Sequence, residues 1–329
     1  MKKIFYTLMI VALFVSCLQK PKTMENLWPS GIERYWAGPQ FLSVPETAWK
    51  LDSGRLVCVK PGRNRGVVML TRAVSYPTEG FEISFEGGFV NENLRAGTKM
   101  GIVLGLPEKD EDTINFEKAL FAGVSSDGKL MLAEKSVMLK KALVPGEKMI
   151  FDVEGTPTEN GRLHLLLRVR NEASDIELGE LSVNTDPGLV KGLVSLFCDS
   201  GAEGVKGGAV WFEALEINGA AIAGFPEKAR GPVLDVDYRF NDNNLQMTVK
   251  TAPLVLNDNN RFVVLQVRGS GEWETVDKKA LDKGYSVTFN VEVKETENRY
   301  YRVYTRFIDR FGSLKYHYVT GKLTQSKTE

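Results

Sequence analysis

Apolar and polar side chains alternate with a period of two along most of this chain. Phe81, Ile83 and Phe85 alternate with polar neighbours, and the segment 163–170 repeats the pattern with leucine and valine on one side. Successive side chains of a β-strand point to opposite sides, so this alternation predicts strands with one buried face. Helical periodicity is nearly absent. We therefore expect an all-β fold of packed antiparallel sheets.

Tight turns and one proline-rich break organise the predicted strands. Asp127-Gly128 and Asn160-Gly161 have the positive-φ chemistry of hairpin turns. The stretch GFPEKARGP combines two prolines, two glycines and three charges, which is typical of a linker. We expect a first domain over residues 28–224, a linker over 225–232, and a second domain over 233–323.

The N-terminus, MKKIFYTLMIVALFVSC, resembles a bacterial lipoprotein signal over residues 1–17. Its apolar run of about a dozen residues is shorter than the roughly 20 that a membrane span needs. Cys17 occupies the position at which the thiol receives diacylglycerol, although Phe14 departs from the usual aliphatic residue. Leu18, rather than Asp, follows it, which by resemblance favours the outer membrane. We expect an exported protein, lipid-anchored through Cys17 on the periplasmic or surface side, with residues 18–27 as a tether. An ordinary cleaved signal is the alternative.

Composition excludes several function classes. The chain has 42 basic and 42 acidic residues, and this zero net charge provides no long-range field for nucleic acid. His164 and His317 are the only histidines, so a histidine-rich catalytic centre is excluded. We predict no catalytic residue, no metal and no cofactor.

Cys58 and Cys198 lie in the predicted strands RLVCV and VSLFC. An exported protein can join them by a disulfide. Sequence does not supply the distance between the two Cα atoms. A disulfide and two separate buried thiols therefore both remain open.

Several stretches resemble the N-terminal region of secreted alkaline phosphatase D-like metallophosphatases. The resemblance covers roughly residues 28–323, which is most of the mature chain, and rests on pattern and order, without one diagnostic motif. The stretches are GPQFLSVPETAWKLDSGRLVCV (Gly38–Val59), VVMLTRAVSYPTEGFEISF (Val67–Phe85), ALFAGVSSDGKLML (Ala119–Leu132), FVVLQVRGSGEWETV (Phe262–Val276) and RYYRVYTRF (Arg299–Phe307).

This resemblance implies a fold and a context. The fold is a concanavalin A-like (laminin G-like) jelly-roll sandwich followed by an immunoglobulin-like or fibronectin III-like sandwich, both accessory. In that family the metal-binding catalytic residues lie in a later domain, which would begin where this chain stops, at Glu329. No position here matches a family catalytic residue. A phosphatase catalytic domain is therefore one expected partner.

Trp28, Trp36 and Trp49 gather at the start of the first domain. Their rings could stack on sugar, or they could pack in the core, which is commoner for tryptophan. The stretch TAWKLDSGRLVCV also resembles sandwiches of the 3-keto-disaccharide hydrolase type. No paired acid and base of the kind that glycoside cleavage requires is identifiable. Glu82 and Glu86 share a strand face and are expected to be solvated.

Alternating tyrosines and arginines form the best candidate interface. Tyr300, Arg302, Tyr304 and Arg306 occupy one face of a predicted strand, and Gln266 and Arg268 lie on a possible neighbour. Tyrosine and arginine are enriched at binding hot spots. The alternative is a surface ladder of cross-strand pairs, each contributing roughly 0.2–1 kcal/mol.

Two further segments are weighed as ion sites. The acidic stretch Glu108–Asp112, with Asn115 and Glu117 nearby, could offer oxygens to calcium but matches no known loop spacing. Asn64 in the turn PGRNRG, between two arginines, could bind an anion. A solvated loop and a simple turn are the alternatives.

These observations favour a non-catalytic binding or scaffold lipoprotein that engages a glycan or a partner protein. The first alternative is a glycan-active enzyme that uses the first sandwich. The second is a truncated or split phosphodiesterase-alkaline phosphatase that lacks its catalytic domain.

Overall fold

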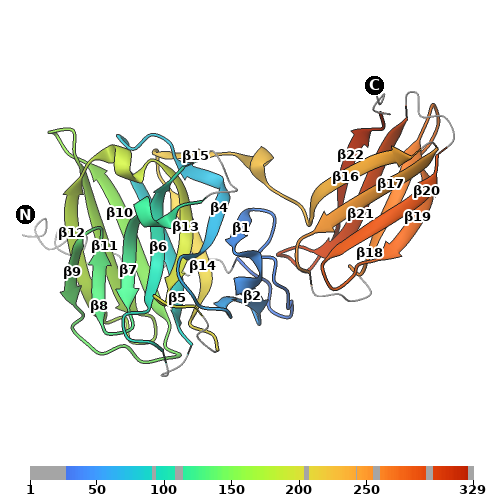
Figure 1. Ribbon diagram of the computed structural model, residues 1–329. Helices are drawn as coiled ribbons and strands as arrows, with labels where there is room; N and C mark the ends of the chain where they lie inside the picture. The colour runs from blue at the N-terminus through green and yellow to red at the C-terminus, as the bar shows by residue number, and fades with distance from the viewer. Residues whose placement is uncertain are drawn as a thin grey trace, which may run out of the picture.

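The structure is a computed structural model that describes residues 27–90, 94–107, 114–203, 207–241, 243–254, 260–293 and 299–324. The signal segment 1–17 with Cys17, the tether as far as residue 26, and the acidic stretch Glu108–Asp112 lie outside these ranges. The described chain is all-β, as the alternation predicts, with short 3₁₀-helices as its helical elements (Figure 1). Within the described ranges, no helix has the length and hydropathy needed to cross a membrane.

Two sheets form the first domain, and each mixes strands that are distant in sequence. The eight-stranded sheet has the order β1-β4-β13-β6-β7-β8-β9, with β15 pairing to β4. Its strands are β1 (Phe41–Val44), β4 (Arg65–Val74), β6 (Lys99–Leu106), β7 (Leu120–Ser125), β8 (Lys129–Leu132), β9 (Lys135–Met138), β13 (Gly192–Asp199) and β15 (Ile222–Gly224). The seven-stranded sheet has the order β12-β11-β10-β5-β14-β3-β2. Its strands are β2 (Trp49–Asp52), β3 (Arg55–Cys58), β5 (Phe81–Phe89), β10 (Met149–Pro157), β11 (Leu163–Asn171), β12 (Glu177–Thr185) and β14 (Val210–Asn218).

One continuous hydrophobic core lies between these sheets. Phe85 of β5 stacks on Phe151 of β10, with ring centroids 4.4 Å apart and planes within 5°. Along β11 the inward residues Leu163, Leu165 and Leu167 are fully buried, while every second residue is partly exposed. The period-two pattern therefore marks the core face, as expected.

The turns and 3₁₀-helices connect these strands locally. Gly128 and Gly161 adopt φ values of 83° and 75° in the turns that join β7 to β8 and β10 to β11. An L-residue with a Cβ is disfavoured at such φ values, which is why these two turns use glycine. The 3₁₀-helices are η2 (Glu46–Ala48), η4 (Phe116–Lys118), η5 (Pro187–Val190) and η6 (Pro226–Lys228).

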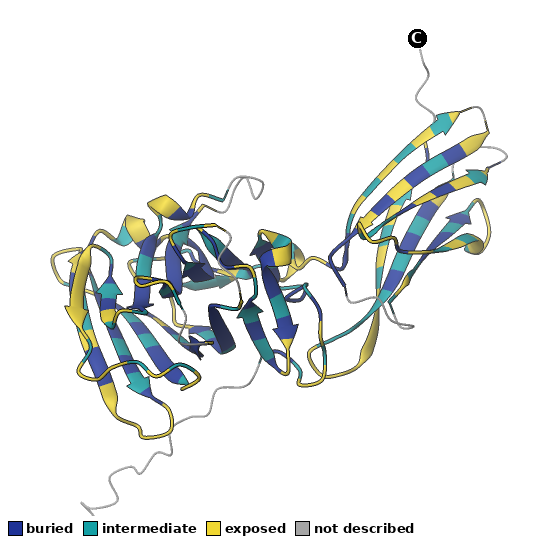
Figure 2. Ribbon diagram, turned by 60° about the horizontal axis from the view of Figure 1, so that its bottom comes forward, coloured by how far each residue is buried: buried dark blue, intermediate teal, exposed yellow. Residues whose placement is uncertain are grey.

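Strand pairing changes between Gly224 and Val233, and the later strands form two further sheets. The three-stranded sheet has the order β16-β17-β20, and the four-stranded sheet the order β19-β18-β21-β22. Their strands are β16 (Val233–Asn241), β17 (Asn244–Thr251), β18 (Phe262–Arg268), β19 (Glu274–Ala280), β20 (Ser286–Glu292), β21 (Tyr300–Ile308) and β22 (Leu314–Lys322). Both sheets contribute to one core that includes Phe289 and Val303, so this domain is also a two-layer sandwich. Its strands show bands of buried and exposed residues (Figure 2).

The segment before β1 contacts the second domain. Arg34 Nη1 donates to the carbonyl of Ile308 at 2.6 Å, and Trp36 packs edge-on against Phe307 with centroids 5.3 Å apart. Arg34 is itself buried, with its Nε donating to the carbonyl of Trp36 at 2.8 Å. Burial lowers the pKa of the Arg34 guanidinium to about 10, while the Asp309 carboxylate acts in the opposite direction. A guanidinium with this pKa stays charged at neutral pH.

Candidate functional site

The three tryptophans of the first domain are interior residues. Trp28, Trp36 and Trp49 are 2%, 6% and 0% exposed. The indole N–H of Trp28 donates to the carbonyl of Ala37 at 3.1 Å, and Trp49 packs against Phe212. Their ring faces are covered by protein. Of the two alternatives that the sequence left open, these positions agree with core packing and not with rings that stack on sugar.

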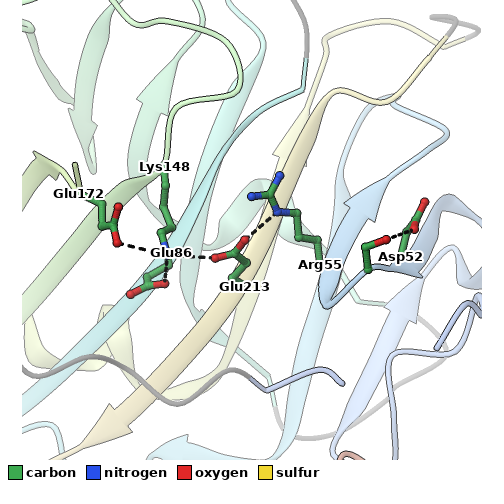
Figure 3. A network of polar contacts seen from close by, with 7 residues as sticks. Asp52, Arg55, Glu86, Lys148, Glu172 and Glu213 are labelled. Carbon is green, nitrogen blue, oxygen red and sulfur yellow. Dashed lines mark hydrogen bonds and ion pairs between the residues drawn. The ribbon is translucent and has the colours of Figure 1, made fainter. Parts of the chain in front are cut away.

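A charged network lies on the seven-stranded sheet, at strands β3, β5 and β14 and at the start of β10 (Figure 3). Lys148 Nζ lies 3.2 Å from a Glu86 carboxylate oxygen, 3.1 Å from Glu213 and 3.6 Å from Glu172. Arg55 Nε donates to the other oxygen of Glu213 at 2.6 Å. One ammonium and one guanidinium thus hold three carboxylates together.

Burial changes how these groups titrate. It raises the pKa of the Glu213 carboxyl, but the hydrogen bonds from Arg55 and Lys148 outweigh it, and the pKa lies below its usual value. Burial likewise lowers the pKa of the Lys148 ammonium, but hydrogen bonds to Glu213 and Glu86 leave it raised. An acid–base catalyst works best with a pKa near the operating pH. Both shifts move away from neutrality, so this network suits a fixed charge cluster better than proton transfer.

Sequence reasoning missed this network. It treated Glu86 as a solvated residue like Glu82, but the structure places Glu86 in a buried position and leaves Glu82 exposed. The Arg55 guanidinium also lies over the ring of Trp211, 3.9 Å from its centroid. Because β5, β14 and β3 are neighbours only through the sheet order, no local pattern announces these contacts.

The predicted tyrosines and arginines do lie on one outward face of the second domain. Tyr300, Arg302, Tyr304 and Arg306 alternate with the core residues of β21, Tyr301, Val303 and Thr305. Strand register adds neighbours on both sides: Gln266 and Arg268 from β18, and Tyr316 and Tyr318 from β22. We call this set, with Trp273 of the loop before β19, the aromatic face.

Rings gather at the β21–β22 side of the aromatic face. Tyr304 lies 5.2 Å from Tyr318 and 5.9 Å from Tyr316, centroid to centroid. Tyr316 and Tyr318 have ring planes within 16° of each other. They are 48% and 47% exposed, so these rings meet solvent rather than a protein core. Large exposed apolar groups that gather in one place commonly mark a binding surface.

Arginines interleave with the rings on the β18 side. The Arg302 guanidinium lies 4.5 Å from the centroid of Trp273 and 5.0 Å from that of Tyr318. Arg268 lies over Trp273 at 4.8 Å and over Tyr300 at 5.7 Å. These are cation–π distances. The arginine and aromatic side chains therefore pack against one another on the outer face of the sheet.

Sequence reasoning named six of the nine residues of the aromatic face, and missed Tyr316, Tyr318 and Trp273. Alternation within one strand showed that Tyr300 to Arg306 share a side. Tyr316 and Tyr318 carry the same i, i+2 signal in the stretch LKYHYVTGK, and could have been found by pairing that stretch with β21 as a hairpin. Trp273 could not have been found in this way, because its place on the aromatic face depends on the conformation of the loop before β19.

Cys58 and Cys198 are brought together from opposite sheets, and both are fully buried free thiols. A hydrogen bond with Cys58, together with burial, raises the pKa of the Cys198 thiol well above its usual value. The Cys198 thiol is therefore protonated at physiological pH.

The weighed ion sites gain no support from the described residues. Asn115 Oδ1 accepts the backbone N–H of Glu117 and caps η4, so it is engaged locally. Asn64 occupies a turn with φ of 53°. The carboxylate of Glu203 binds the neighbouring side chain of Arg65 and the backbone N–H of Arg63, and so takes the place of an external anion. Across the described ranges, no group of three His, Cys, Asp or Glu side chains gathers as a metal site.

Comparisons with known proteins give fold neighbours. No family model matches this chain, and no curated protein matches it in sequence. Among solved structures, a seed lectin of Lotus tetragonolobus is 11% identical with a TM-score of 0.37, over 54% of this chain and 92% of the lectin. Peanut lectin with a nonapeptide is 13% identical with a TM-score of 0.35, over 51% and 88%. A marine alginate lyase from Aplysia kurodai is 11% identical with a TM-score of 0.35, over 50% and 82%. The neighbours are concanavalin-like and lectin-like sandwiches, and scores this low carry no conclusion about activity or ligand.

Proposed function

We propose that this protein is a non-catalytic, glycan-binding lipoprotein, exported and anchored through Cys17, that contacts its ligand with the aromatic face of the second domain. The observation that carries the proposal is the set of solvent-exposed rings at Tyr300, Tyr316 and Tyr318 on one rigid sheet face.

Ring chemistry supports a sugar ligand. The face of an aromatic ring is apolar and weakly negative, and it attracts the C–H groups on one side of a sugar ring. Tyrosine offers this surface at low conformational cost because it has two side-chain torsions. An open face formed by β18, β21 and β22 suits an extended polymer better than a small molecule, which favours an enclosed pocket.

The domain architecture agrees with an accessory role. The division into three-stranded and four-stranded sheets around one core supports an immunoglobulin-like or fibronectin III-like assignment for the second domain. The two large sheets of the first domain support a concanavalin A-like assignment.

The pKa directions of Lys148 and Glu213 support a structural use of the charged network.

A protein partner is the second candidate, and the tyrosine–arginine composition of the aromatic face favours it. The resemblance to alkaline phosphatase D-like enzymes would make that partner a metallophosphatase domain. Hydrolysis of a phosphate ester by the purified chain with added divalent metal would show that the chain itself is catalytic and would overturn the non-catalytic proposal.

Affinity electrophoresis tests glycan binding directly. The mature chain carrying Cys17→Ser, which cannot be lipidated, is run through gels that contain polygalacturonate, its methyl ester, dextran, dextran sulfate or hydroxyethylcellulose. We expect retardation in at least one gel, and we expect Tyr316→Ala and Tyr318→Ala each to weaken it by about 1 kcal/mol, or about fivefold.

Tyr76→Ala is the matched control, because Tyr76 is 59% exposed but lies in the first domain. It should migrate like the parent chain. Unretarded migration in every gel, or equal loss in all three variants, would overturn the proposal.

A further inference from the structure

We propose that the glycan bound by the aromatic face is an anionic polysaccharide, one that carries carboxylate or sulfate groups on its sugar rings. This inference rests on the proposed function and names its ligand class.

Charge on the aromatic face has one sign. The outward positions of its strands follow from the register of β18, β19, β21 and β22. None of these positions on the four strands is an aspartate or a glutamate. Those that carry charge are all basic: Arg268, Lys278, Arg302, Arg306 and Lys322.

The other outward face of the same sandwich has a different composition. On the three-stranded sheet the exposed charges have both signs: Asp235, Asp237 and Glu292 lie there together with Arg239 and Lys250. Between them lie hydroxyl and amide ladders, such as Thr248 beside Thr288 at 3.2 Å. The whole chain is neutral, with 42 basic and 42 acidic residues. The basic aromatic face is therefore a local segregation of charge rather than a property of the protein.

Arg302 is positioned to bind an anion at the centre of this face. Gln266 Oε1 accepts from its Nε at 2.9 Å and from its Nη2 at 2.6 Å. Trp273 and Tyr318 flank the guanidinium plane. Nη1 has no hydrogen-bond partner among the described residues. A guanidinium held in one plane with free N–H groups matches the oxygens of a carboxylate or sulfate.

The combination of rings and cations selects the occupant. A sugar ring that contacts the exposed part of Tyr318 would place an acidic substituent within reach of Arg302, since those two side chains are themselves in contact. A single-stranded nucleic acid also uses rings and arginine. The N-terminal signal predicts export, away from the nucleic acids of the cell interior. An anionic polysaccharide is the ligand that fits both the face and the predicted location.

Two pairs of polymers that differ mainly in charge test the inference on the Cys17→Ser chain. Polygalacturonate is compared with its methyl ester, and dextran sulfate with dextran, by isothermal titration at low and high NaCl. We expect at least one acidic polymer to bind about tenfold or more tightly than its neutral partner. We expect that affinity to fall as salt rises, because salt screens exposed charges. The pair that responds identifies carboxylate or sulfate as the anion.

Arg302→Gln should lower the ratio of the affinities for the acidic and the neutral polymer about tenfold, whatever it does to the binding of the neutral polymer. Arg239→Gln, on the opposite face of the sandwich, is the matched control and should bind like the parent. Melting temperatures of both variants verify folding.

The outcomes separate the two proposals. Equal binding of the charged and neutral polymers overturns the anionic ligand but keeps glycan binding. No binding of any polymer overturns both. Preferential binding of a single-stranded oligonucleotide or of vesicles with anionic lipid, over both acidic polymers, also overturns this inference and assigns the face to a different macromolecule.

Discussion

Lys148 shows how a single residue keeps the outer surface of the seven-stranded sheet stable. Its ammonium lies within 3.2 Å of oxygens from both Glu86 and Glu213, whose side chains are largely buried. Two ionised carboxylates that approach each other in a poorly solvated place repel unless a cation lies between them. We therefore expect the network to stabilise the fold, and we expect its contribution to depend on pH.

Lys148→Met should lower the free energy of unfolding by about 1–3 kcal/mol at neutral pH, because it leaves buried carboxylates without their cation. Lys141→Met, at an exposed loop lysine, is the control. The folded-state pKa of Glu213 lies below 4.5. Its stabilising contribution is thus complete above that value and disappears as pH falls through the folded-state pKa. Urea unfolding should show the gap between Lys148→Met and the parent narrowing on acidification. A gap that stays constant with pH would argue against an electrostatic role.

We expect a second effect of pH on stability at His317, in the second domain. Its Nδ1 accepts the backbone N–H of Val233 at 3.2 Å, which requires that nitrogen to be unprotonated. Burial lowers the pKa of the His317 imidazole from 6.5. The unfolded chain therefore takes up a proton first as pH falls below about 6.5, and stability decreases until the folded-state pKa is passed. His317→Gln should flatten this part of the stability profile relative to the parent. Parallel profiles would show that another group is responsible.

Individual strands differ in how well the sequence alone predicts them and their buried faces. Where one side of a strand faces water, as in β11 and β21, alternation alone identified the strand and its buried face. It fails for β13, in which nearly every residue is buried. The outer side of that strand is covered by Phe116 and its neighbours, which belong to a distant segment. The open choice for the three tryptophans and the missed charged network share this cause, because their surroundings come from long-range pairing that no local pattern contains.

The contact between β3 and β13 predicts a covalent link. Cys58 and Cys198 lie in opposite sheets with their thiols in hydrogen-bonding contact. Refolding with oxidised glutathione should join them, with two hydrogens lost from the thiols and glutathione reduced. The product should be about 2–4 kcal/mol more stable than the dithiol form. Mass spectrometry of the cross-linked peptides checks it, and Cys58→Ala is the control. Recovery of two alkylatable thiols after oxidative refolding would instead establish the separate-thiol alternative.

Across the whole molecule, the segment from Arg34 to Phe41 connects the domains. Trp36 joins a small cluster with Ala252, Leu254 and Phe307 of the second domain. Trp36→Ala should remove this contact at a cost of about 3–5 kcal/mol and split thermal unfolding into two transitions. Calorimetry measures this, with Tyr76→Ala as the control. One unchanged transition would show that the cluster does not couple the domains.

Trp273 provides the most direct test of ligand binding at the aromatic face. The other four tryptophans, Trp28, Trp36, Trp49 and Trp211, are buried, whereas Trp273 is partly exposed beside Arg302. Titrating the Cys17→Ser chain with polygalacturonate or its methyl ester should produce a saturable change in tryptophan emission. That change should vanish in Trp273→Phe, a variant expected to remain retarded in the polymer gel. Emission that still responds in Trp273→Phe, or that never responds in the parent while the polymer binds, would place the ligand elsewhere on the protein.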